Sequence, residues 1–91
     1  MNFEFDPNKD EANREKHGLM FASGIIVFAD KDKADYEDDR KYYGEERRIC
    51  IGFSEDRILS VCYTIRNKNT IRLISVRPAS RKERRLYYAD N

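Results

Sequence analysis

The chain has 91 residues, of which 38% are charged and 40% hydrophobic, and its formal net charge is +1. A chain of this length builds one hydrophobic core, so we expect residues 1–91 to form a single domain. Eleven aromatic residues argue against intrinsic disorder, and no apolar run approaches the ~20 residues of a membrane-spanning helix. We therefore expect a cytoplasmic protein with no membrane association.

The N-terminal segment predicts a short strand followed by a helix. Residues 3–5 (Phe-Glu-Phe) alternate in polarity, as the residues of a half-buried strand do. Asp6 offers a side-chain oxygen to the free N–H groups of a helix, and Pro7 suits the first helical position. The helix is expected to run through residues 8–17 and to end at Gly18, which accepts a left-handed backbone.

Residues 21–28 fit either a helix or a strand. Three large apolar residues of this segment recur at helical spacing, whereas Gly24 and the β-branched residues 25–27 favour a strand. We favour a short helix. The charged stretch 30–44 is expected to be a loop, with residues 35–37 as a candidate edge strand.

The middle of the chain predicts an antiparallel meander of three strands. Residues 47–53, 58–66 and 70–77 are rich in Ile, Val, Tyr and Phe. Polar segments at 54–57 and 67–69 separate them and have the composition of turns. Strands joined by such short turns pair with their neighbours in antiparallel fashion.

The C-terminal segment predicts one more helix. Pro78 ends the last strand, and Ser80 and Glu83 have the spacing of a capping box, so a helix should begin near residue 80 and reach about residue 89. The elements together predict an α+β fold, in which an antiparallel three- to four-stranded sheet carries two N-terminal helices and one C-terminal helix.

Hairpins without a bulge would give this sheet one apolar face and one divided face. The apolar face, covered by the two N-terminal helices, is expected to carry Leu59, Val61, Tyr63, Ile65, Ile71 and Leu73. One end of the opposite face seats the last helix through Leu86, on Ile51, Phe53, Ile58 and Val76. The other end gathers Arg47, Thr64, Arg66 and Arg72. In this register Arg77 falls on the covered face.

The arginines gathered on one sheet face indicate an anion-binding surface. Guanidinium groups on neighbouring strands repel one another unless anions compensate them. Glu45 could compensate them in part, and an RNA phosphate or a carboxylate of a partner could do more. The charge distribution agrees, since residues 1–46 have a balance of −6 and residues 47–91 a balance of +7. The alternative is an ordinary solvated sheet surface with its arginines in water.

Several classes of site find no support in the sequence. The four glycines are too dispersed for a phosphate-cradling loop. The single histidine and the absence of a cysteine motif argue against a zinc site, and Cys50 and Cys62 are interpreted as buried thiols. We expect neither a metal nor another cofactor.

Short motifs along nearly the whole chain resemble those of the BrnT toxin family, in the same order. The resemblance begins with residues 3–6, Lys9, Asn13, residues 16–18 and Phe21, continues with residues 44–47 and 64–66, and closes with residues 71–79 and 83–87. The sequence departs from the family pattern at Phe5, where Trp is favoured, at Val76, where Ala is usual, and at Gly24 inside the second helix. These departures concern packing more than chemistry.

The resemblance implies a RelE-like fold and a metal-independent endoribonuclease that inhibits translation and arrests growth. It also implies a BrnA-like antitoxin with a DNA-binding domain, in a 2:2 complex that represses its own operon. The alternative is a non-catalytic basic module that binds nucleic acid or a partner in such a complex.

Metal-free RNA cleavage by 2′-hydroxyl attack needs a group that takes a proton, a group that returns one, and cations for the phosphorane charge. The residues expected to bind RNA or its phosphates are Lys16, Arg47, Thr64, Arg66, Arg77 and Arg84. The catalytic candidates are His17, Arg72, Glu83 and Tyr87.

Each candidate for proton transfer also has a structural interpretation. His17 could favour a helix C-terminus, Glu83 could serve the capping box, and Tyr87 could pack on the sheet. Likewise, Thr64 could satisfy a neighbouring strand, and Lys16 could be an ordinary surface charge.

Overall fold

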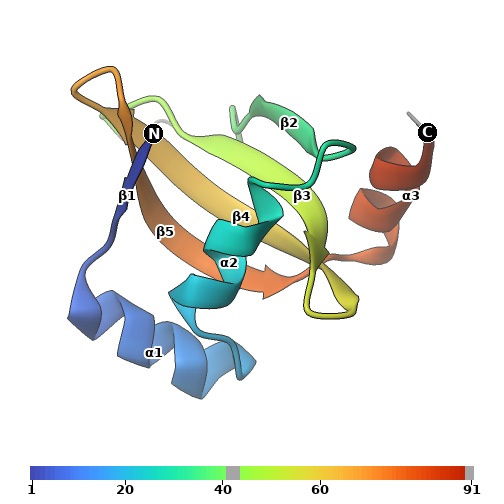
Figure 1. Cartoon of the computed structure of the whole chain (residues 1–91), viewed down its shortest axis with the longest axis horizontal. Coiled ribbons are helices and arrows are strands. Elements are labelled where there is room, and N and C mark those ends of the chain that lie inside the picture. The colour runs from blue at the N-terminus through green and yellow to red at the C-terminus, as the bar shows by residue number, and fades with distance from the viewer. Residues whose placement is uncertain (41–43, 90–91) are drawn as a thin grey trace.

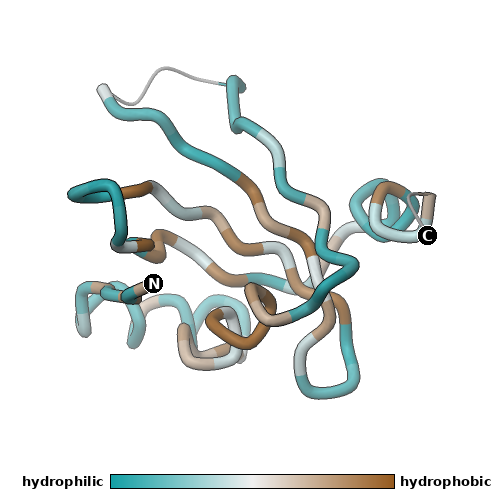
Figure 2. The backbone as a smooth tube through the Cα atoms, turned by 45° about the horizontal axis from the view of Figure 1, so that its top comes forward, coloured by the Kyte–Doolittle hydropathy of each residue, from teal (hydrophilic) through white to brown (hydrophobic). Residues whose placement is uncertain are grey.

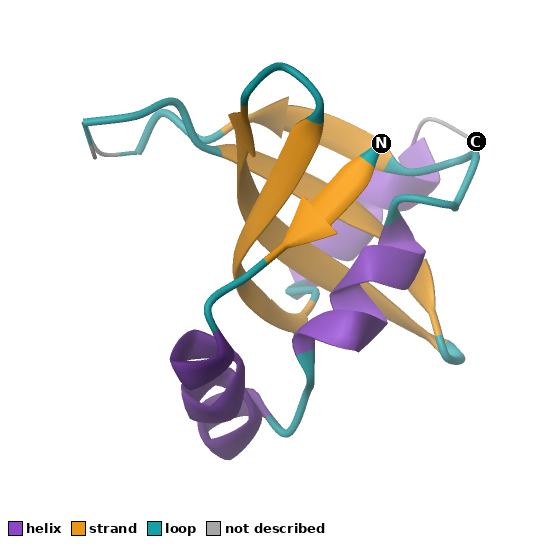
Figure 3. Ribbon diagram, turned by 60° about the vertical axis from the view of Figure 1, so that its left-hand side comes forward, coloured by secondary structure: helices purple, strands orange, loops and turns teal. Residues whose placement is uncertain are grey.

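The computed structural model describes residues 1–40 and 44–89, which form a sheet with helices on both faces (Figures 1 and 3). In chain order the elements are β1 (Asn2–Glu4), α1 (Pro7–His17), α2 (Phe21–Val27), β2 (Ala34–Glu37), β3 (Arg48–Ser54), β4 (Arg57–Arg66), β5 (Thr70–Pro78) and α3 (Arg81–Ala89). The predicted α+β class and the three helices are confirmed, and residues 41–43 of the predicted loop lie outside the described residues. No helix of the described segments has the length and apolarity to cross a membrane.

The sheet has five strands in the order β1-β5-β4-β3-β2. The expected meander of β3, β4 and β5 is antiparallel, and β2 adds to β3 in the same sense. The sheet is nevertheless mixed rather than wholly antiparallel, because β1 runs parallel to β5. The alternation in residues 3–5 identifies a strand, but a local pattern cannot say which neighbour that strand joins.

Helix α1 begins and ends where its caps require. The Asp6 carboxylate accepts a hydrogen bond from the Asn8 N–H at 2.8 Å, with Pro7 at the first helical position. Gly18 adopts a left-handed backbone with φ of 70°, and its N–H donates to the Arg14 carbonyl at 2.8 Å. These contacts confirm both predicted helix ends.

Helix α2 lies so close to the sheet that only a glycine fits at its centre. A Cβ atom on Gly24 would lie 2.5 Å from a methyl group of Val76 and 3.2–3.3 Å from Leu73 and Val61. Residues 21–27 are helical because packing across this face outweighs the strand preference of residues 25–27. The glycine that departs from the family pattern is thus a packing requirement of this chain.

A β-bulge in β5 changes the expected register. Thr64 pairs with Arg72 as expected, but Cys62 pairs with Ser75, so that Ile74 is the additional residue. Beyond the bulge Val76 pairs with Val61 and enters the core under α2, while Arg77 pairs with Ser60 on the opposite face. The bulge-free register therefore placed both residues on the wrong face.

The core has two parts, one on each side of the sheet. Under α1 and α2 it contains Leu19, Phe21, Val27, Cys50, Leu59, Val61, Tyr63, Ile71, Leu73 and Val76. Under α3 it contains Ile49, Ile51, Ile58, Cys62, Ala79 and Tyr87. Contrary to expectation, Leu86 and Phe53 are exposed and Tyr87 seats α3, and Ile65 is also exposed at its end of β4. Figure 2 shows hydrophobic colours along α2 and the central strands and hydrophilic ones on the connecting turns.

Buried Asn13 ties α1 to β5 just beyond the bulge. Its amide nitrogen donates to the carbonyls of Leu19 and Val76 at 2.9 and 2.8 Å, and its oxygen accepts the Val76 N–H at 3.0 Å. Because buried polar groups are costly when unpaired, this triple contact fixes the C-terminal end of α1 against the strand that carries Arg77.

Candidate functional site

One face of the sheet is only partly covered, because α3 packs across one end of it. In the paired register Thr64 lies opposite Arg72 at the open end, and Ser60 lies opposite Arg77 where α3 begins. The face thus presents two charged groups of residues, one at each end. We call them the open-end cluster and the α3-end cluster.

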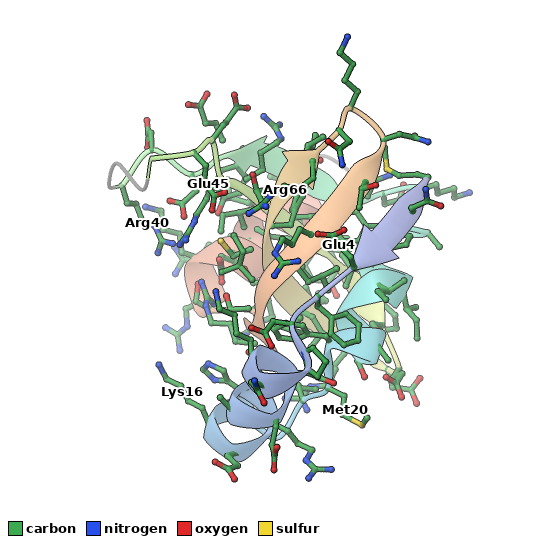
Figure 4. All side chains as sticks on the ribbon, turned by 90° about the vertical axis from the view of Figure 1, so that its left-hand side faces the viewer. Glu4, Lys16, Met20, Arg40, Glu45 and Arg66 are labelled. Atoms are coloured by element: carbon green, nitrogen blue, oxygen red, sulfur yellow. The ribbon has the colours of Figure 1, made fainter. Side chains whose placement is uncertain are left out.

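The open-end cluster consists of Arg47, Arg66 and Arg72 with the carboxylates that hold them. Glu45 bridges two of these arginines, with an oxygen 3.3 Å from a guanidinium nitrogen of Arg66 and another 3.5 Å from Nε of Arg47. Glu4 accepts from Arg72 at 2.7 Å. Figure 4 shows Glu45, Arg66 and Glu4 on one side of the molecule. The carboxylates offset the repulsion between the arginines.

Three predicted features of this cluster occur in the structure. The arginines share a face with Thr64, because Thr64 and Arg66 alternate along β4 and Arg72 lies opposite Thr64. Glu45 is the compensating carboxylate, as expected. The hydroxyl of Thr64 donates to the Glu46 carbonyl at 2.7 Å, so it also ties the segment before β3 to β4.

The α3-end cluster consists of Arg77 and Glu83 with two serines. Arg77 donates to both carboxylate oxygens of Glu83, at 2.6 and 2.9 Å. The Ser60 hydroxyl and the Ser80 N–H also donate to that carboxylate, at 2.9 and 2.8 Å, and the Ser80 hydroxyl accepts the Glu83 N–H at 3.2 Å. The predicted capping box is thus present, and it orients the arginine as well.

Glu83 is a buried, ionised carboxylate. Burial alone would raise the pKa of Glu83, but the hydrogen bonds from Arg77, Ser80 and Ser60 lower it to about 2. A group with so low a pKa holds a proton poorly at neutral pH and is a weak general base. The geometry therefore favours Glu83 as the residue that orients Arg77, whose side chain is 32% exposed.

His17 is the last residue of α1 and lies within electrostatic reach of Arg77. Partial burial, together with the charges of Lys16 and Arg77, lowers the pKa of His17 below its usual value of 6.5. The imidazole is therefore mainly neutral at pH 7. The favourable interaction of a histidine with a helix C-terminus requires the charged imidazole. The structure therefore argues against the interpretation that His17 serves to stabilise the C-terminus of α1. The neutral form of an imidazole is the form that can accept a proton.

The structure does not bring Tyr87, Arg84 and Lys16 into either cluster. The Tyr87 hydroxyl donates to Asp30 at 2.7 Å, and this hydrogen bond, followed by burial, raises the pKa of Tyr87 to about 12. Arg84 donates to the Ala79 carbonyl at 2.8 Å. Lys16 projects from α1 on the same side as Arg66 in Figure 4, but well away from it. These positions favour the packing interpretation of Tyr87.

Three features of the candidate site were not found by sequence reasoning. The pairing of Glu4 with Arg72 depends on the parallel contact of β1 with β5, which no local pattern indicates. Ser60 joins the α3-end cluster only because of the bulge. Tyr36 on β2 faces the same side, where the charges of Glu83 and Arg77 act on its hydroxyl. The sequence around Tyr36 indicated only a candidate edge strand at residues 35–37, and it did not indicate a place for Tyr36 in the site.

The described residues offer no cluster typical of a metal centre. Within 1–40 and 44–89, no three His, Cys, Asp or Glu side chains are arranged to hold an ion. Cys50 and Cys62 are buried free thiols, and burial raises the pKa of both, that of Cys50 to about 12. Thiols in such surroundings are poor nucleophiles, and the two cysteines are packing residues as expected.

Comparisons with known proteins agree on one family. The model of the family described as "Ribonuclease toxin, BrnT, of type II toxin-antitoxin system" matches residues 5–83. Among solved structures, the chain is similar to the ribonuclease toxin BrnT of Brucella abortus, with 25% sequence identity and a TM-score of 0.71. That similarity covers 89% of this chain and 99% of the Brucella chain. No curated protein sequence matches significantly.

Proposed function

Because the chain belongs to the BrnT family of ribonuclease toxins of type II toxin–antitoxin systems, we propose that it is a metal-independent endoribonuclease acting on the open face of its sheet. In this reaction the 2′-hydroxyl of the RNA attacks the adjacent phosphorus, a P–O bond to the 5′ oxygen breaks, and a 2′,3′-cyclic phosphate forms. The proton of the 2′-hydroxyl goes to a base, and the leaving oxygen receives one from an acid.

The proposal depends on Arg77, which Glu83 holds in place within electrostatic reach of His17. The bidentate contact with Glu83 fixes the guanidinium, which remains partly exposed and offers its charge to a phosphate. A preorganised cation at the position where phosphorane charge develops stabilises the transition state more than the ground state. His17, largely neutral at pH 7, is the base that accepts the 2′ proton.

The open-end cluster would bind the flanking phosphates of the RNA strand. Arg47, Arg66 and Arg72 are already held by carboxylates in the free protein, so their side chains are ordered before RNA arrives. RNA phosphates must compete with Glu45 and Glu4 for these guanidinium groups. Because cations that neutralise RNA phosphates release counterions, binding should weaken steeply as the salt concentration rises.

The family also supports an antitoxin partner. We propose a BrnA-like DNA-binding antitoxin that forms a 2:2 complex with the toxin, and translation as the process that the free toxin inhibits. An inhibitor of this chemistry should bring acidic or hydrophobic groups to the open face, where the arginines lie. Arg72 and Arg77 would then serve RNA in the free toxin and the antitoxin in the complex.

Induced expression of the protein and of Arg77→Ala in a bacterium tests the ribonuclease proposal. We expect the unaltered chain to arrest growth and, once purified, to cleave RNA in EDTA to products with 2′,3′-cyclic phosphate ends. Arg77→Ala should slow cleavage by about 10²–10³-fold, the range found when one donor to a transition-state charge is removed. Arg72→Ala, which removes a contact to a flanking phosphate, should instead weaken RNA binding and its dependence on salt. Arg57→Ala is the matched control, because exposed Arg57 lies at the opposite end of β4 from Arg66.

The pairing of these arginines with carboxylates of the same chain favours a second candidate function, that of a non-catalytic binding module. Each of Arg47, Arg66, Arg72 and Arg77 has a carboxylate partner within the chain, as the arginines of a purely structural or binding surface would. A non-catalytic module would bind RNA or its partner in a salt-dependent way and yield no cleavage products. Cleavage in EDTA that persists equally in Arg77→Ala would refute the catalytic assignment.

A further inference from the structure

A hollow lies between the edge strand β2 and helix α3, at the border of the open face. It is an open depression with a volume of about 740 Å³ and is lined by Lys33, Ala34, Asp35, Tyr36 and Leu86. Two of its lining residues are large hydrophobic side chains that remain partly exposed, since Tyr36 is 37% exposed and Leu86 is 42% exposed. An aromatic ring and an aliphatic side chain thus line one hollow and are both accessible to a ligand.

The pairing of the strands places this hollow beside the α3-end cluster. Tyr36 pairs with Ile49, which pairs with Cys62 in the centre of the face. Arg77 pairs with Ser60, which lies two residues before Cys62 on β4. Its strand, β5, is the third strand from β2 in the sheet. Three strand spacings amount to about 14 Å between the backbones of β2 and β5, and Tyr36 and Arg77 lie on the same face of the sheet.

The electrostatics around Tyr36 agree with this placement. Burial raises the pKa of Tyr36, and the charges of Glu83 and Arg77 act on the same hydroxyl, so Tyr36 is neutral at pH 7 and lies within electrostatic reach of the α3-end cluster. The Asp35 carboxylate would repel a phosphate, but it accepts hydrogen bonds from Tyr63 at 2.6 Å and Arg48 at 3.1 Å. Lys33 adds a positive charge to the lining.

We propose that this hollow binds one base of the RNA strand, stacked on the ring of Tyr36 and packed against Leu86, next to the phosphate held by Arg77. The inference rests on the proposed ribonuclease function. Single-stranded RNA is recognised largely by unstacked bases that lie on aromatic side chains. Because every base has a π face, stacking of this kind adds affinity with little sequence preference, and Tyr36 would fix the position of the RNA strand relative to the cleaved bond.

The test measures binding and stacking separately from cleavage. The probe is a short single-stranded RNA that is 2′-O-methylated throughout, which prevents cleavage, and that carries the fluorescent base 2-aminopurine. Anisotropy gives the Kd, and quenching of 2-aminopurine reports stacking. The variants are Tyr36→Ala, Tyr36→Phe and Leu86→Ala, with Tyr88→Ala as the matched control, because Tyr88 is an exposed tyrosine of α3 that lines a different hollow. Circular dichroism and Tm verify that each variant folds.

We expect Tyr36→Ala to raise the Kd about tenfold or more and to abolish quenching, since stacking contributes this much per base. Tyr36→Phe keeps the ring and should stay within about twofold, and Tyr88→Ala should match the unaltered protein. An unchanged Kd and unchanged quenching in Tyr36→Ala would overturn the proposal. Loss of antitoxin binding with RNA binding intact would overturn it too, and would assign the hollow to the antitoxin.

The same experiment distinguishes this site from the ribonuclease proposal. Cleavage of unmodified RNA that proceeds normally while Tyr36→Ala behaves like the unaltered chain would refute the base site alone. If the unaltered chain cleaves no RNA but still quenches 2-aminopurine through Tyr36, the ribonuclease proposal fails and the base site stands.

Discussion

Replacing Glu83 with Gln tests the electrostatics of the α3-end cluster most directly. Hydrogen bonds from Arg77, Ser80 and Ser60 lower the pKa of Glu83 from 4.5 to about 2, although burial opposes them. A carboxyl with a depressed native pKa stabilises the fold fully above its unfolded value, and that contribution is lost as the pH falls toward the native value. The difference corresponds to about 3 kcal/mol at pH 7.

We expect Glu83→Gln to lower the free energy of unfolding by about 2–3 kcal/mol at pH 7, since the amide keeps the shape but not the charge opposite Arg77. The gap between the two proteins should narrow by about 1.5 kcal/mol at pH 3.5, because the unaltered Glu83 then holds its proton in the unfolded chain. Urea unfolding at a series of pH values measures this gap. The paired comparison cancels the other acidic groups of lowered pKa, Asp30 and Asp38.

Exposed Glu15 on α1 provides the control, because Glu15→Gln removes the same charge without a buried partner. Its effect on unfolding should stay within about 0.5 kcal/mol at every pH. A gap between Glu83→Gln and the unaltered protein that is equal at pH 7 and pH 3.5 would refute the reasoning, since the stabilisation would then not come from the charge.

Three further outcomes follow from other contacts. Gly24→Ala should destabilise the fold by about 1–3 kcal/mol in thermal unfolding, because its methyl group would overlap Val76, and a gain of stability from helix propensity would contradict the packing argument. If His17 is the base, the pH–rate profile of cleavage should have its acidic midpoint below 6.5, and His17→Ala should slow cleavage about 10²–10⁴-fold; a midpoint above 6.5 would exclude the neutral imidazole. Tyr87→Phe should cost about 1–2 kcal/mol of unfolding free energy through its hydrogen bond to Asp30 and leave kcat unchanged, whereas a large fall in kcat would restore Tyr87 to the catalytic residues.

Local chemistry explains why much of the fold was predictable from the sequence. The ends of α1 follow from Asp6 and Gly18, whose side chain and backbone freedom act on the nearest residues alone. The hairpins follow from polar turns between apolar strands, and the capping box from the spacing of Ser80 and Glu83. Such signals lie within a few residues of the structure that they specify.

The candidate site was predictable only in part, for the same reason. The pairing of Thr64 with Arg72 can be predicted by counting residues on each side of the short turn between β4 and β5. This counting gives the correct pairs only up to the bulge at Ile74. Beyond the bulge the bulge-free register is wrong. It placed Arg77 on the face covered by α2, whereas the structure places Arg77 in contact with Glu83 on the opposite face. The sequence thus indicated the open-end cluster, but not the α3-end cluster around Arg77.

The sequence by itself determined the order of helices and strands, the helix ends and the family, because these depend on neighbouring residues and on motifs in a fixed order. The tertiary structure alone decided the parallel partner of β1, the bulge in β5 and the carboxylate that each arginine contacts. These features depend on contacts between residues far apart in the chain, where packing of α2 on Val76 and pairing of Glu4 with Arg72 outweigh any local preference.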